Sequence, residues 1–207
     1  MEIFSEALFK THLYGLTIYV HPKVYAPSDD TYLLIDSLEL SGGEIFLDLG
    51  SGTGIVGIYA AKRGAKEVFQ IDINPYAAIL SKCNSHINFV DKVTHVVVGD
   101  LLTPLRGHVE FDIIAFNPPY LPVQDKGLLE KSWSGGASGR EVIDKFLDSF
   151  HEYLKYDGEI YVVGSSLSNY DLTLKALERK RYRWKIVSKK RFFFEEIVVI
   201  KAWRHIK

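Results

Sequence analysis

An asparagine, two prolines and a tyrosine end an apolar run near the middle of the chain. Residues 111–116 are β-prone, and the motif Asn117-Pro118-Pro119-Tyr120 follows them directly. Because prolines donate no backbone N–H and fix φ, the strand must stop here and the turn is stiff. The motif therefore holds an amide side chain, a free carbonyl and an aromatic ring at a strand end, which is where open α/β sheets bind ligands.

This set of atoms suits chemistry on a planar nitrogen. An amide nitrogen or an exocyclic base amine is a poor nucleophile because its lone pair is delocalised. Two acceptors on its N–H groups, here the Asn117 side-chain oxygen and the Pro118 carbonyl, can pull the nitrogen toward a tetrahedral shape, while Tyr120 packs on the planar group. An Asn-Pro turn that only closes a strand is also common, so the motif alone leaves both alternatives open.

A glycine-rich loop earlier in the chain predicts a nucleotide-like cofactor. The loop Asp48-Leu-Gly50-Ser-Gly52-Thr-Gly54 joins an apolar strand to a helix. Its second half, with Gly57, also fits the G-x-G-x-x-G fingerprint of dinucleotide sites, and Asp72 falls near the distance expected for an acid on a ribose. An NAD-dependent oxidoreductase is therefore one alternative.

Acids at three successive strand ends favour S-adenosylmethionine over NAD. Asp48 precedes the first glycine, where it would repel a pyrophosphate but suits a cationic ligand. Asp72 and Asp100 end the next two strands, from which they would reach ribose hydroxyls and the adenine amine. The glycines let the backbone approach the cofactor closely. Each acid alone could be a helix cap, but the three together favour the cofactor, and the asparagine motif has no role in hydride transfer.

Apolar strands alternate with helices along the 207 residues, which predicts a single α/β domain with a mostly parallel sheet. Residues 1–40 are expected to cover the cofactor site and 41–207 to form the catalytic core, with an irregular segment before the first strand and a functional or mobile loop over 121–138. Expected strands are 16–20, 44–50, 67–73, 94–98, 111–116, 158–163, 184–187 and 196–203, the last two antiparallel. Expected helices are 28–40, 55–63, one from Pro75, 139–154 and 168–180.

Composition narrows the function classes. The net charge of −1 supplies no global attraction to nucleic acid or anionic membranes. The single cysteine, Cys83, excludes a disulfide framework and favours a reducing compartment. No apolar run approaches membrane-spanning length and no signal peptide is evident, so we expect a cytoplasmic protein. The histidines lack metal-ligand spacing, so no metal is predicted.

The motifs resemble the class I, seven-stranded methyltransferases, which have a three-layer Rossmann-like fold and act on planar nitrogens. Within that class the chain is similar to HemK/PrmC-type protein-glutamine methyltransferases of the archaeal and eukaryotic release-factor branch. That branch has segments like Val24-Tyr-x-Pro-x-x-Asp30-Thr31 and Trp133-x-Gly-Gly-x-x-Gly139-Arg-Glu141. The resemblance covers about residues 24–165, and it departs at Asp48, where many members carry glutamate.

The resemblance implies a substrate, a partner and a set of site residues. The methyl acceptor would be the glutamine of the Gly-Gly-Gln loop in a class-1 translation release factor, its amide held by residues 117–120. A small zinc-binding activator protein would pair with the exposed sheet edge, here Thr94 to Val98. The S-adenosylmethionine site would consist of Thr31, Asp48, Gly50, Gly52, Gly54, Asp72, Ile73, Asp100, Leu101 and Asn117.

Two further functions remain open on the sequence. An RNA or DNA amine methyltransferase would use the same motif, and a basic stretch over residues 175–191 could contact RNA, although a solvated helix-and-strand face is the better explanation of that stretch. A non-catalytic cofactor-binding subunit is disfavoured by the intact motif at 117–120.

Overall fold

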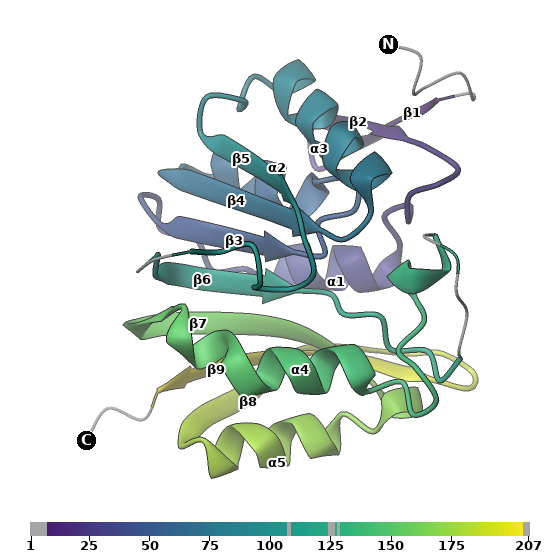
Figure 1. Cartoon of the computed structure of the whole chain (residues 1–207), viewed down its shortest axis with the longest axis vertical. Helices are drawn as coiled ribbons and strands as arrows, with labels where there is room; N and C mark the ends of the chain where they lie inside the picture. Colours follow the sequence, from purple (N-terminus) through teal and green to yellow (C-terminus); the bar gives the residue numbers. More distant parts are fainter. Residues whose placement is uncertain (1–7, 107–108, 124–126, 128, 205–207) are drawn as a thin grey trace.

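The computed structural model describes residues 8–106, 109–123, 127 and 129–204. Its main feature is one twisted sheet in the strand order β5-β4-β3-β6-β7-β9-β8 (Figure 1). Within this sheet β9 alone runs in the direction opposite to the other strands, so the predicted mostly parallel, seven-stranded sheet is confirmed. The strands are β3 Ile45–Leu49, β4 Glu67–Asp72, β5 Thr94–Val98, β6 Phe111–Phe116, β7 Leu154–Ser165, β8 Tyr182–Arg191 and β9 Glu196–Arg204.

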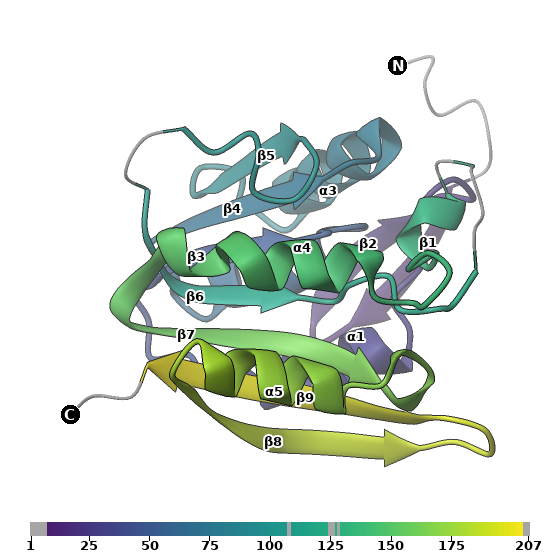
Figure 2. The same ribbon diagram turned by 60° about the horizontal axis from the view of Figure 1, so that its bottom comes forward.

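Helices cover both faces of this sheet (Figures 1 and 2). Helices α4 and α5 lie on one face, and α1 and α2 lie on the other, with α3 beside α2. The helices are α1 Asp29–Ser37, α2 Ile55–Lys62, α3 Pro75–Ile87, α4 Glu141–Ser149 and α5 Asp171–Arg179. Among the described residues, no helix combines the length and apolarity needed to cross a membrane.

The central strands are largely apolar because both of their faces are buried. In β6, Ile114 and Phe116 belong to the core under α4 and α5, whereas Ile113 and Ala115 belong to the core under α1 and α2. This alternation explains why the run before Asn117 contains few polar residues. It also fixes the register, since a shift of one residue would exchange the two faces.

A hairpin before α1 corrects the expectation of an irregular N-terminal segment. Strand β1 (Phe9–Leu13) pairs antiparallel with the predicted strand β2 (Leu16–Val20) through a two-residue turn, Tyr14 and Gly15, that has positive φ at both positions. Strand β1 is largely exposed, so its sequence carries no clear alternation. Pairing with β2 makes it a strand.

Two other boundaries differ from the prediction. The helix expected to run to Leu154 ends at Ser149 and passes through the 3₁₀ turn Phe150–Glu152. Strand β7 therefore begins at Leu154, before the expected start at Gly158. The predicted long connection 121–138 lies partly outside the described residues, and it includes the short 3₁₀ turn Glu130–Ser132.

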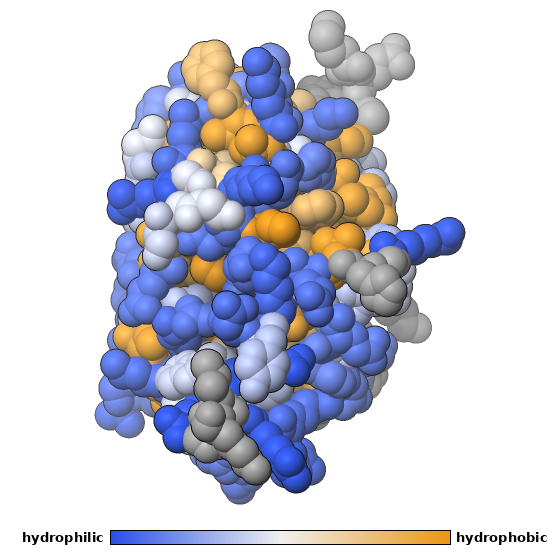
Figure 3. Space-filling model, turned by 90° about the vertical axis from the view of Figure 1, so that its left-hand side faces the viewer, coloured by the Kyte–Doolittle hydropathy of each residue, from blue (hydrophilic) through white to orange (hydrophobic). Residues whose placement is uncertain are grey.

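The surface differs between the two ends of the sheet. On the face shown in Figure 3, hydrophobic side chains gather in the upper half, which is the end that holds β4 and β5 in Figure 1, and the lower half is mostly hydrophilic. Strand β5 is the last strand at this end, and Val98 on it is 50% exposed.

Candidate active site

The glycine loop between β3 and α2 bends because of three left-handed residues. Gly50, Gly52 and Gly54 have φ of 65°, 54° and 81°, which side chains other than glycine rarely adopt. Gly54 also needs its lack of a side chain, because a Cβ there would lie 2.4 Å from Ser81 Oγ. The loop is thus held in one shape by its own sequence and by α3.

Asp48 fastens the start of α2 to the sheet. Its buried carboxylate accepts hydrogen bonds from the Gly57 backbone N–H (2.9 Å) and from Gln70 Nε2 (3.3 Å). Burial raises the pKa of Asp48 to about 7, and these two hydrogen bonds oppose the rise. A carboxylate at this position is also stabilised by the positive end of the α2 helix dipole.

Asp72 fastens the glycine loop to the end of β4. Its two carboxylate oxygens each accept one backbone N–H, from Gly52 and from Asn74, both at 2.8 Å. Burial raises the pKa of this carboxyl above its ordinary value. A carboxylate has about four acceptor positions, so Asp72 keeps the capacity to bind ribose hydroxyls.

These strand ends surround a cavity of about 520 Å³. The cavity lies at the carboxyl ends of β3, β4, β5 and β6, where parallel sheets bind ligands. Of the predicted site residues, only Gly54 does not line it; this glycine instead accepts a hydrogen bond from Gln70 Nε2 through its carbonyl. The residues that the structure brings together are Thr31, Asp48, Gly50, Gly52, Asp72, Ile73, Asp100, Leu101, Asn117, Pro118, Pro119 and Tyr120.

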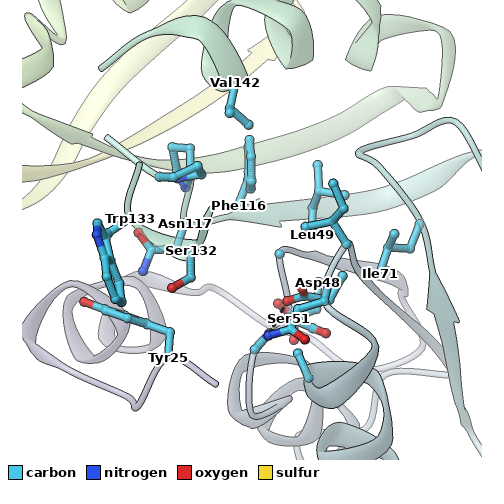
Figure 4. Close-up of a pocket in the computed structure, with 18 of the residues that line it drawn as sticks. Tyr25, Asp48, Leu49, Ser51, Ile71, Phe116, Asn117, Ser132, Trp133 and Val142 are labelled. Carbon is cyan, nitrogen blue, oxygen red and sulfur yellow. Dashed lines mark hydrogen bonds between the residues drawn. The ribbon is translucent and has the colours of Figure 1, made fainter. Parts of the chain in front are cut away.

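Asn117 provides an unused acceptor in this cavity. Its Oδ1 is buried and has no hydrogen-bond partner among the described residues. Figure 4 shows the Asn117 side chain beside Ser132, Trp133 and Tyr25, with Asp48, Ser51 and Ile71 on the other side of the cavity. Leaving a buried carbonyl oxygen without a donor costs about 1–3 kcal/mol, so a ligand N–H is expected to fill the position.

Tyr120 is held by a buried acid that the sequence analysis did not assign to the site. Asp30 Oδ2 accepts hydrogen bonds from the hydroxyls of Tyr120 (3.2 Å) and Tyr25 (3.1 Å), and Asp30 is only 2% exposed. Burial, followed by the charge of Asp30, raises the pKa of both tyrosines, that of Tyr25 to about 12. Both therefore stay protonated at neutral pH and act as donors and walls rather than as bases.

Other cavity residues were missed from sequence, among them Tyr25, Ser132 and Trp133. Tyr25 and Trp133 stand in the two segments that carry the family resemblance, so that resemblance was the signal for them. Ser132 lies on the short turn Glu130–Ser132 and has no motif of its own.

A family model decides the class of the protein. The model described as "Methyltransferase small domain" matches residues 15–193. The chain belongs to this methyltransferase family. S-adenosylmethionine is its cofactor, and the cavity fits it, because strand-end carboxylates and glycine backbone line one half. The family resemblance, the predicted fold class, the enzyme class and the cofactor are thus confirmed. The alternative of an NAD-dependent oxidoreductase is rejected.

The curated relatives are named as methyltransferases, and some of them as glutamine methyltransferases. "Putative protein N5-glutamine methyltransferase MJ0928" of Methanocaldococcus jannaschii is 36% identical over 194 residues, which cover 92% of this chain and 96% of the relative. Human "Methyltransferase HEMK2" is 39% identical over 173 residues, covering 76% and 78%. The "Release factor glutamine methyltransferase" of Aquifex aeolicus is 29% identical over 203 residues, covering 91% and 71%.

Solved structures agree with this methyltransferase fold. The E. cuniculi Mtq2–Trm112 complex, described as responsible for methylation of the eRF1 translation termination factor, has a TM-score of 0.69 at 28% identity, covering 88% of this chain and 99% of that chain. The M. jannaschii tRNA m1G37 methyltransferase has a TM-score of 0.70 at 23% identity and covers 98% of this chain and 56% of that chain, a likeness of fold alone.

Proposed function

We propose that this methyltransferase transfers a methyl group to the side-chain amide nitrogen of the glutamine in the Gly-Gly-Gln loop of a class-1 translation release factor. The observation that carries the proposal is the Oδ1 of Asn117, which has no hydrogen-bond partner in the part of the chain that the structure describes and lies between aromatic side chains beside the acid-lined half of the cavity. The relatives named as glutamine methyltransferases support the same acceptor.

Asn117 and Pro118 would bind the acceptor amide through its two N–H groups. S-adenosylmethionine, when bound, supplies a methyl group on a positively charged sulfur. The Asn117 oxygen and the Pro118 carbonyl draw the amide nitrogen out of planarity, and both hydrogen bonds strengthen as positive charge develops on that nitrogen. Positioning of well-oriented groups can lower an activation barrier by ~7–11 kcal/mol. We therefore expect most of the rate enhancement to come from holding the amide in this position.

No strong general base is needed for this reaction. The methylated amide nitrogen is acidic and can lose its proton late. The structure agrees with that expectation, because the two tyrosine hydroxyls in the acceptor half, those of Tyr25 and Tyr120, donate to Asp30 and remain protonated. Their role would be to keep the aromatic walls of the acceptor half in place.

The site residues other than Gly54, which does not line the cavity, are proposed to bind the cofactor or the acceptor amide as the sequence suggested. Asp72 would bind the ribose and Asp100 the adenine amine, while Ile73 and Leu101 would flank the base. Gly50 and Gly52 would allow the loop to approach the cofactor. Thr31 is buried beside Asp30, to which its hydroxyl donates at 3.1 Å, and it would close the methionine end. Asp48 would act on the cation both directly and through α2, and Gly54 would act only through the shape of the loop.

The proposal is tested with a labelled-methyl assay. The chain is incubated with methyl-labelled S-adenosylmethionine and, separately, with a class-1 release factor, a Gly-Gly-Gln peptide and bulk RNA, each with and without cell extract. Label on the glutamine of the release factor is expected. Label only in RNA would assign the enzyme to the nucleic-acid amine methyltransferases instead.

We also propose that a small zinc-binding activator protein pairs with β5. Strand β5 lies at the edge of the sheet, and an uncovered edge strand with exposed valine is prone to association. The solved Mtq2–Trm112 complex supports such a partner. Val98→Glu should abolish co-purification of the partner; unchanged co-purification would contradict the assignment to this edge.

A translation-factor substrate would also place the protein in the cytoplasm.

A further inference from the structure

Two phenylalanines are exposed at the tip of the β8–β9 hairpin. Phe193 and Phe194 are 92% and 85% exposed, and their rings pack edge to face with centroids 4.6 Å apart. Phe192, the preceding residue, packs against the buried core and fixes the base of the turn. Two adjacent rings held in water in this way are typical of an interaction site, because aromatic side chains gain much from burial against a partner.

This tip lies at the same end of the sheet as the cavity. Ser165 at the end of β7 stands opposite Ile197, and Val162 of β7 stands opposite Phe116, the residue before Asn117. Figures 1 and 2 show the β8–β9 turn projecting at the edge to which β6 and β7 point. A protein whose glutamine enters the cavity therefore approaches the end of the sheet from which the turn projects.

The base of the turn is tied to the wall of the acceptor half. Glu195 Oε1 accepts a hydrogen bond from Ser165 Oγ at 2.6 Å, and its charge contributes to raising the pKa of Tyr25 and of Tyr120. Lys190 Nζ forms an ion pair with Asp29 Oδ1 at 2.8 Å, at the start of α1. The exposed rings are thus carried on a fixed support beside the acceptor half.

The charges around the turn favour a protein partner over a nucleic acid. Lys189 pairs with Glu196 at 3.8 Å and Lys190 pairs with Asp29, while Glu195 adds a further negative charge next to the phenylalanines. Arg191, the last residue of β8, stands opposite Glu196 in the hairpin. Three basic residues, Lys189, Lys190 and Arg191, therefore meet three carboxylates, those of Asp29, Glu195 and Glu196, near the tip. A phosphate backbone would gain little here, whereas an apolar depression on a protein would bury both rings.

We propose that Phe193 and Phe194 dock the release factor outside its Gly-Gly-Gln loop by entering an apolar depression on its surface. The inference rests on the proposed function, because it takes a folded protein as the methyl acceptor. It assigns the hairpin a role in substrate recognition, separate from the residues that hold the amide. The docking contributes to affinity for the intact release factor and not to the transfer step.

The test compares two variants on the same protein substrate. Phe193→Ala with Phe194→Ala removes the docking rings. Tyr156→Ala is the matched control, because Tyr156 is a 62% exposed aromatic at the opposite end of β7. The assay measures KM and kcat for methylation of the release factor, and thermal unfolding confirms that each variant is folded.

The double variant is expected to raise KM about tenfold, as the loss of an aromatic anchor typically does, and to leave kcat unchanged. The control is expected to match the wild type in both constants. An unchanged KM in the double variant, or a loss confined to kcat, overturns the docking inference while the proposed function stands. Weaker binding to bulk RNA with an unchanged KM would reassign the tip to nucleic acid. A wild-type enzyme that does not methylate the release factor overturns both proposals.

Discussion

The two halves of the cavity are built in different ways. In the cofactor half, the carboxylate of Asp48 already accepts a backbone N–H of α2, and that of Asp72 accepts backbone N–H groups of the glycine loop and of Asn74. In the acceptor half, side chains from residues 24–31, 117–120 and 132–133 meet, and the Oδ1 of Asn117 has no partner among the described residues. The acids of the cofactor half thus hold the surrounding backbone in place. The acceptor half instead keeps a hydrogen-bond acceptor free for the substrate amide.

This contrast predicts that substitutions in the two halves change different quantities, either the rate of methyl transfer or the affinity for the cofactor. A substitution in the acceptor half should slow methyl transfer and spare the fold, since its key acceptor stabilises nothing in the free protein. Substitution of Asp72 in the cofactor half should weaken cofactor binding and stability together, because the carboxylate that faces the cofactor also accepts the backbone N–H groups of Gly52 and Asn74.

The largest effect is expected for Asn117→Ala. It removes an acceptor that strengthens its hydrogen bond in the transition state, which typically costs about 3–4 kcal/mol, so single-turnover transfer should slow several hundredfold. Because Oδ1 is an unsatisfied buried acceptor, the free energy of unfolding should not fall through loss of a hydrogen bond. Rapid-quench assays and urea unfolding measure the two quantities. An unchanged transfer rate would show that the acceptor half has been misassigned.

Gly54→Ala should produce the largest loss of stability. The new Cβ would lie 2.4 Å from Ser81 Oγ at a residue with φ of 81°, so we expect a loss of about 3 kcal/mol. Gly43→Ala is the matched control, because Gly43 also has positive φ (92°) but open space at the Cβ position, and should cost about 1 kcal/mol. Equal losses in urea unfolding would show that packing against α3 does not shape the loop.

Asp72→Asn should weaken cofactor binding with a smaller effect on the chemical step. The amide leaves one oxygen acceptor where Gly52 and Asn74 now donate to two, and it removes the charge. We expect the dissociation constant for S-adenosylmethionine to rise about tenfold to a hundredfold, corresponding to hydrogen bonds to a charged group. Isothermal titration measures this directly. A normal affinity combined with slow transfer would reverse the assignment of the two halves.

Asp48→Asn should have the smallest effect, on the pH dependence of stability. The pKa of Asp48 is about 7 in the folded protein and 3.8 in its ordinary state, so folding takes up a proton between these values. Its contribution to stability is full below about pH 4 and is lost as the pH rises to about 7. Asparagine can still accept from Gly57, so the variant should be about 1 kcal/mol more stable than wild type at pH 8.

Urea unfolding at pH 5 and pH 8, without cofactor, checks this expectation. The gain of the variant over the wild type should appear at pH 8 and shrink at pH 5. A wild type that is instead favoured at the higher pH would mean that the carboxylate is stabilised in its charged form.

The same contrast explains which parts of the site could be predicted from sequence. The strand, glycine loop and helix around Asp48 follow from local patterns, and so does the stiff turn after Phe116. The bond between Asp30 and Tyr120 joins residues 90 positions apart, and no local pattern specifies it. Gly54 was predicted to bind the cofactor because it completes the motif, but a close contact with α3 is what requires a glycine there.

The buried strands of the fold were predicted more completely than its exposed strand and strand ends. Buried strands carry a continuous apolar signal, whereas the exposed strand Phe9–Leu13 forms only through its pairing partner. The early start of β7 at Leu154 was missed for a similar reason, since Lys155 to Asp157 are polar or exposed and resemble a loop.

A crystal structure with S-adenosylhomocysteine and a Gly-Gly-Gln peptide tests the central claim most directly. We predict that the glutamine amide donates to Asn117 Oδ1 and to the Pro118 carbonyl, with its nitrogen facing the cofactor sulfur and the ribose on Asp72. A glutamine bound elsewhere, with Asn117 Oδ1 still without a donor, would contradict the account.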